Sequence, residues 1–121
     1  MKRILSAIAV SAILSMPAAA DKLVVYTYDS FASEWGPGPK IKKAFEAQCA
    51  CKLELVALDD GVSVLNRLRL ECKNSKADVL LGLDNNLLEE AKKTGLLMEH
   101  QVDTSKLLLP GGWEDKTFVP F

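Results

Sequence analysis

Three short apolar runs alternate along this chain with stretches that have the spacing of amphipathic helices. The runs lie at residues 22–28, 52–58 and 77–83, and turn-forming residues bound each of them. Runs of this length, rich in β-branched and aliphatic residues, are predicted to be buried strands. A β-α-β-α-β-α order implies a parallel sheet with helices packed on its faces through right-handed crossovers. The sequence therefore predicts an α/β fold.

The first predicted helix runs from Pro39 to Cys49. Proline is favoured at the first position of a helix because its missing N–H group has no partner there. The residues that follow at i, i+3, i+4 and i+7 form a stripe that is expected to face inward, namely Ile41, Ala44, Phe45 and Gln48.

The second predicted helix follows residues 59–61, with Asp60 or Ser63 as its cap. Its inward face is expected to carry Leu65, Leu68 and Cys72. The third helix follows the triple capping signal of residues 84–86, in which Asp84 is predicted to be a cap. It is expected to end at the lysines and the glycine of residues 92–95.

Residues 1–20 have the three parts of a secretory signal peptide: a basic start, an apolar run and small residues before the cleavage point after Ala20. The apolar run is shorter than the roughly 20 residues that cross a bilayer, so we expect an exported chain without stable membrane insertion. The formal net charge of −1 and the absence of a Lys/Arg block argue against nucleic acid as a partner.

The chain has three cysteines, and an exported protein meets an oxidising compartment. We expect at least one disulfide, either Cys49 with Cys51 or one of these with Cys72, and one free thiol. His100 is the sole histidine and is far from these cysteines in sequence, so no metal site is predicted.

Polar side chains gather where the predicted strands end. In a parallel α/β sheet, ligands bind outside the carboxyl ends of the strands, near the point where strand order reverses. Each of these corners carries an acid, at residues 28–30, 59–61 and 83–85, and Trp35 follows on the first loop. Carboxylates beside Tyr28 and Trp35 suit an organic cation, which is held by charge and by a ring face.

No catalytic constellation is present in the sequence. Gly36 and Gly38 lack the third glycine of a dinucleotide fingerprint, and Ser30 has no general base beside it in sequence. We therefore predict a protein that is not an enzyme. The chain stops at Phe121 directly after a β-prone run, which we interpret as an interrupted strand in a shortened chain.

Four separated blocks give the sequence a family resemblance. They are VYTYDSF…WGPGP, LVALDDGVSVLNRLRLE, KNSKADVLLGLDNNLL and PGGW…TFVPF. Together they resemble the bacterial periplasmic thiamine-binding proteins, the substrate-binding components of thiamine ABC importers. The resemblance implies that residues 21–121 are a partial N-terminal lobe of a type II periplasmic binding fold, with the second lobe absent.

The same resemblance implies a function and a site. The ligand would be thiamine, thiamine monophosphate or thiamine diphosphate, bound in the periplasm by a monomer, without a cofactor, and passed to the permease and ATPase subunits of an importer. The family's ligand-contacting Asp-Gly pair falls on Asp60 and Gly61. The cleft-facing loop matches by motif at Tyr28, Asp29, Ser30 and Trp35.

Two other functions remain open from the residues alone. One is a binding protein for another solute, such as ferric iron held by Tyr26 or Tyr28, although at least one of these side chains is expected in the core. The other is a small exported interaction domain that uses no small ligand. Because closure of two lobes is what buries a ligand in a cleft, we expect weak or undetectable thiamine binding by one lobe.

Overall fold

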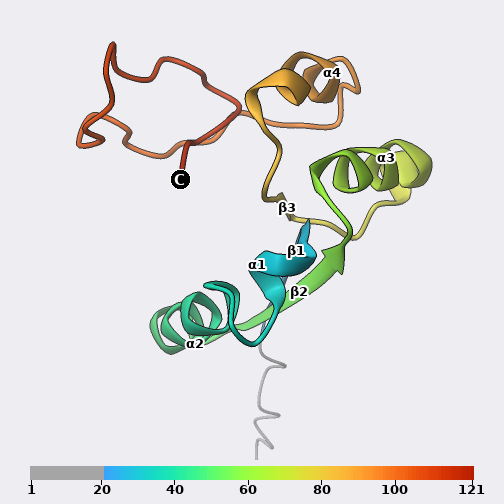
Figure 1. Cartoon of the computed structure of the whole chain (residues 1–121), viewed down its shortest axis with the longest axis vertical. Helices are drawn as coiled ribbons and strands as arrows, with labels where there is room; N and C mark the ends of the chain where they lie inside the picture. Colours follow the sequence, from blue (N-terminus) through green and yellow to red (C-terminus); the bar gives the residue numbers. More distant parts are fainter. Residues whose placement is uncertain (1–20) are drawn as a thin grey trace, which may run out of the picture.

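The computed structural model describes residues 21–121 (Figure 1). The predicted signal peptide, residues 1–20, lies outside the described residues. Within residues 21–121, none of the helices combines the length and the apolar character that crossing a membrane requires.

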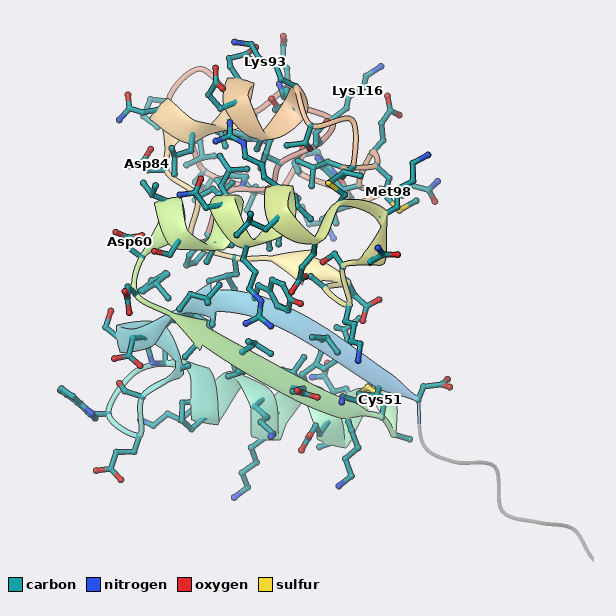
Figure 2. All side chains as sticks on the ribbon, turned by 90° about the vertical axis from the view of Figure 1, so that its right-hand side faces the viewer. Cys51, Asp60, Asp84, Lys93, Met98 and Lys116 are labelled. Carbon is teal, nitrogen blue, oxygen red and sulfur yellow. A yellow bond between two sulfur atoms is a disulfide. The ribbon has the colours of Figure 1, made fainter. Side chains whose placement is uncertain are left out.

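A small parallel sheet lies between helices on its two faces (Figure 2). Strands β1 (Lys22–Tyr28), β2 (Lys52–Leu58) and β3 (Val79–Leu80) are arranged in the order β2-β1-β3. The helices and 3-10 turns are α1 (Asp29–Ala32), α2 (Gly38–Cys49), α3 (Gly61–Glu71), η1 (Cys72–Asn74), η2 (Asn85–Leu87) and α4 (Leu88–Lys92). Because β1 is central, right-handed crossovers to either side of it place α2 and α3 on opposite faces.

The predicted bounds of β1 and β2 are confirmed, whereas β3 is shorter than the predicted strand at residues 77–83. Just before β3, the Asp78 carboxylate accepts a hydrogen bond from the Val24 N–H of β1 at 2.8 Å. This side chain takes the place of a backbone carbonyl of β3. At its other end, Gly82 has φ +101° and leaves the extended conformation. A side-chain hydrogen bond and a glycine therefore limit β3 to two residues.

The core lies mainly between the sheet and α3. Val64, Leu65 and Leu68 of α3 are at most 5% exposed, and Tyr26 of β1 is 2% exposed. Complete burial of a side chain such as leucine stabilises a fold by about 1.5–3 kcal/mol. The inward face predicted for this helix is thus correct for its two leucines.

Cys72 is the exception on that face, since it is exposed. The α-helix ends at Glu71, and Cys72 has φ +50°, so the helical spacing that would turn its side chain inward no longer applies. Its Sγ instead donates to the Arg69 carbonyl at 2.9 Å. The other two cysteines form the Cys49–Cys51 disulfide, which resolves the alternatives left open by the sequence.

The predicted inward stripe of α2 is also wrong. Ile41 and Phe45 are 49% and 37% exposed, and the buried residue of this helix is Gly38 in its first turn. Helix α2 packs against β2, the strand at the edge of the three-stranded sheet, so little sheet surface is available to cover the stripe.

After α4 the chain forms an extended loop without regular strands or helices (Figure 1). The β-prone residues before Phe121 are therefore not a strand in this structure. The loop is fastened to α4 by an ion pair between Lys92 Nζ and Asp115 Oδ2 at 2.6 Å. Trp113 Nε1 also donates to the Phe118 carbonyl at 2.7 Å, which closes a turn within the loop.

Candidate ligand-binding site

The carboxyl ends of the three strands meet at one edge of the sheet, which we call the rim: residues 28–30, 59–61 and 82–84. A Cβ atom added to Gly61 would overlap the Gly82 carbonyl, and one added to Gly82 would overlap the Tyr28 ring. Gly61 follows β2, Gly82 follows β3, and Tyr28 ends β1. The two glycines therefore allow the three strand ends to lie in direct contact.

Tyr28 lies where the strand order reverses. The chain leaves β1 for β2 on one side of it and then returns to β3 on the other side. The crevice between β1 and β3 is therefore the position at which α/β sheets of this kind bind ligands. The Tyr28 ring is half-buried there, on Gly82 and edge-to-face with Phe31, with 5.8 Å between the ring centroids.

Asp60 is the N-cap of α3, and its side chain remains exposed. Its Oδ1 accepts the Ser63 N–H at 2.7 Å, and this hydrogen bond is the main reason that the pKa of Asp60 is lowered. An N-cap aspartate satisfies one of the free N–H groups at the helix start. Because its pKa is lowered and its side chain is exposed, the rim presents a carboxylate that is ionised at neutral pH.

Asp84 is confirmed as a cap. It precedes η2, and its Oδ1 accepts the Asn86 N–H at 2.8 Å. Figure 2 shows Asp60 and Asp84 on the same side of the molecule, at the starts of α3 and η2, which are in contact. The two capping carboxylates therefore give this side of the molecule a negative charge.

The remaining predicted residues come from the loop after β1. Asp29 and Ser30 are exposed and belong to α1, directly after Tyr28. Trp35 is 84% exposed, so it does not belong to the packed rim. Its loop returns toward the rim, because Gly36 lies against the carbonyl of Ser30. The structure thus brings Tyr28, Asp60 and Gly61 together and leaves Trp35 projecting beside them.

The tyrosines of β1 have different environments. The Tyr26 hydroxyl donates to Glu71 Oε2 at 2.8 Å, and Arg67 lies over the Tyr26 ring and donates to Glu71 Oε1 at 2.8 Å. Hydrogen bonding to Arg67, and then to Tyr26, lowers the pKa of Glu71. Because Tyr26 is buried in this contact, it and Tyr28 do not offer two phenolates to one ferric ion. In residues 21–121 no three His, Cys, Asp or Glu side chains lie together as a metal site.

Gly82 is the rim residue that the sequence reasoning missed. It stands between the leucines of the third apolar run, and a glycine inside a strand pattern often marks a close approach of two backbones. That signal was present in the sequence. Its meaning depends on the position of the Tyr28 ring, which a single sequence does not reveal.

The chain is strongly similar in sequence to part of the length of several known proteins. No protein-family profile matches the chain. It is 68% identical over 99 residues to the thiamine-binding periplasmic protein of Escherichia coli K12, which covers 82% of this chain and 30% of that protein. The protein of the same name from Brucella abortus is 50% identical over 103 residues, covering 85% of this chain and 31% of the relative.

A solved structure supports the same relationship. The periplasmic thiamin binding protein superposes with a TM-score of 0.80 at 63% identity, over 87% of this chain and 33% of that one. The chain spans about a third of the length of the relatives it matches. The predicted α/β class, as part of a type II periplasmic binding fold, is confirmed, and the expected periplasmic location agrees with the names of the relatives. In sequence and in fold, the chain is therefore similar to about a third of a periplasmic thiamine-binding protein.

Proposed function

We propose that the rim of this chain is one side of a binding cleft for thiamine and its mono- and diphosphates. The chain would act in the periplasm as a binding component without enzymatic activity, and the ligand would pass to the permease and ATPase of an ABC importer. The observation that carries the proposal is the contact between the three strand ends, which places Tyr28 beside the Asp60–Gly61 corner. The names of the relatives support the choice of ligand.

The chemistry of thiamine matches the groups at the rim. Its thiazolium ring carries a fixed positive charge, which a carboxylate and an aromatic face stabilise without proton transfer. Asp60 supplies an exposed carboxylate with a lowered pKa, and Tyr28 supplies the ring. The aminopyrimidine ring of thiamine has donors and acceptors that complement the Asp60 carboxylate and the free N–H group of Gly61 at the start of α3.

This rim is open to solvent, which limits the affinity of the chain by itself. Asp29, Ser30 and Asp60 are all exposed, so a ligand held at the rim would keep much of its surface in contact with water. Sites that bind small molecules tightly bury about 70–90% of the ligand surface. We therefore expect dissociation constants in the millimolar range for the chain alone.

An amide-resolved NMR titration tests the proposal. Thiamine is added to the chain up to about 20 mM, and thiochrome, its uncharged oxidised form, is added in a parallel experiment. The proposal expects saturable shifts at Tyr28, Gly61 and Gly82 with thiamine and much weaker ones with thiochrome. Equal shifts with both compounds, or thiamine shifts confined to other residues, would show that the rim is not the site.

A further inference from the structure

The outer edge of β2 has free backbone donors. In the order β2-β1-β3 this strand has one neighbour, β1. The Lys52 N–H points toward β1 and donates to the Asp21 carbonyl at 2.8 Å, whereas the Leu53 N–H points away and donates to Glu46 Oε1 of α2 at 2.9 Å. Because alternate residues of a strand direct their N–H groups to opposite sides, the N–H groups of Leu55 and Ala57 also point outward.

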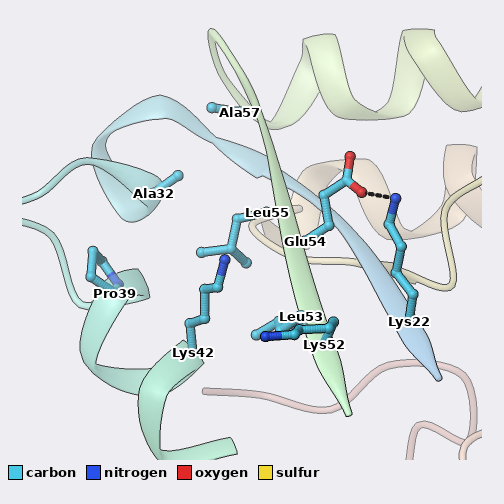
Figure 3. Close-up of a pocket in the computed structure, with 9 residues that line it drawn as sticks. All are labelled: Lys22, Ala32, Pro39, Lys42, Lys52, Leu53, Glu54, Leu55 and Ala57. Atoms are coloured by element: carbon cyan, nitrogen blue, oxygen red, sulfur yellow. Dashed lines mark ion pairs between the residues drawn. The ribbon is translucent and has the colours of Figure 1, made fainter. Parts of the chain in front are cut away.

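A groove lies along this edge. It has a volume of about 690 Å³ and runs between β2 and the start of α2 (Figure 3). Its apolar lining residues are Ala32, Pro39, Leu53, Leu55 and Ala57. Figure 3 shows Leu55 and Lys42 directed toward each other across the groove. The groove is thus bounded by an open strand edge on one side and by a helix on the other, an arrangement that accepts an added strand.

The charges around the groove are mainly positive. Lys22, Lys42 and Lys52 line it, together with Glu54. Glu54 is paired with Lys22, so the charges of Lys42 and Lys52 are uncompensated by ion pairs among the described residues. An extended segment that enters the groove would therefore gain from acidic side chains at its flanks.

We propose that the β2 edge binds an extended acidic peptide segment of another protein by strand addition. Backbone carbonyls of the peptide accept the outward N–H groups of Leu55 and Ala57. Side chains of the peptide alternate between the apolar floor of the groove and the solvent, and acidic residues face Lys42 and Lys52. A second copy of this chain is a poorer partner, because pairing two β2 edges would bring the lysines of the two grooves close to one another.

Fluorescence anisotropy tests the charge preference. The probes are two blocked, labelled hexapeptides with alternating valine, one carrying glutamate and the other lysine at the remaining positions. The glutamate peptide is expected to bind, with an affinity that falls as salt is raised from about 0.05 to 0.5 M. The double variant Lys42→Glu/Lys52→Glu is expected to weaken binding about tenfold. The matched control Lys76→Glu/Lys116→Glu, which lies outside the groove, retains binding.

The backbone contact is tested by amide hydrogen exchange. The backbone amides of Leu55 and Ala57 are expected to exchange more slowly when the glutamate peptide is added. Ala57→Pro removes one outward donor without removing a bond to β1, since proline is tolerated where the N–H of an edge strand faces solvent, and is expected to abolish binding. Equal binding of both peptides, unchanged exchange at these amides, or protection that depends on protein concentration alone would each overturn the proposal. The last result would identify a β2–β2 dimer.

Discussion

Replacing Gly82 by alanine is expected to destabilise the chain in two ways, through the backbone conformation at this position and through the displaced Tyr28 ring. Gly82 has φ +101°, outside the regions that residues with a Cβ atom occupy comfortably, and its added Cβ would overlap the Tyr28 ring. Such a backbone conformation costs on the order of 1–3 kcal/mol for alanine. Moving the ring away from Phe31 forfeits a further 0.5–1.5 kcal/mol, about the value of an edge-to-face pair. The expected loss of stability is about 1.5–4.5 kcal/mol.

Gly95→Ala provides a matched control for this variant. Gly95 also has a positive φ, of +66°, but a Cβ atom placed on it has no neighbour within 4 Å. Alanine at this position is destabilised only by its left-handed backbone conformation, which costs about 1–2 kcal/mol. Urea unfolding monitored by far-UV circular dichroism measures the stability of both variants. Tyr26 and Tyr28 both contribute to the near-UV tyrosine signal, but only the Tyr28 ring lies against Gly82, so a change in this signal that is specific to Gly82→Ala reports the Tyr28 ring. Equal destabilisation by the two substitutions, with an unchanged tyrosine signal, would refute the packing of Tyr28 on the end of β3.

Leu65→Ala is expected to cost about 2–5 kcal/mol in urea unfolding, because Leu65 is 1% exposed. Leu70→Ala, on the exposed side of the same helix, should change stability by no more than about 0.5 kcal/mol. The pKa of Asp115 is lowered to about 2, first by its hydrogen bond to Lys92, so its contribution to holding the C-terminal loop is present above about pH 4 and lost as the pH falls toward 2. Trp113 fluorescence should follow this transition, and Asp115→Asn should remove it; a transition that persists in the variant would assign it to another group.

The parts of the fold that local sequence determines were predicted well. The strands β1 and β2 pair along their full lengths, and their apolar runs have the same bounds as the strands. Asp60 and Asp84 cap the elements that follow them, because capping depends on side chains within three residues of the helix start. Each of these features depends on neighbouring residues in sequence or on a continuous apolar run.

The errors arose where distant residues decide the outcome. The stripe of α2 has helical spacing, yet Ile41 is exposed because the helix lies at the edge of a narrow sheet. Cys72 continues the spacing of α3, but the helix ends one residue before it. At the rim, the sequence indicated that Tyr28 and Asp60 would be neighbours through the logic of parallel sheets. It did not reveal that Gly82 makes their approach possible.

The most direct test of the central claim is the affinity for thiamine of the Asp60→Asn variant. Asparagine is as good an N-cap as aspartate, so this substitution removes the charge and keeps the start of α3. NMR titration is expected to give a dissociation constant about fivefold higher than that of the unmodified chain, with a smaller difference at high salt. Asp103→Asn, which alters another exposed aspartate that bonds a nearby serine, should leave the dissociation constant unchanged. Equal affinities for Asp60→Asn and the unmodified chain would contradict a rim that recognises the thiazolium charge.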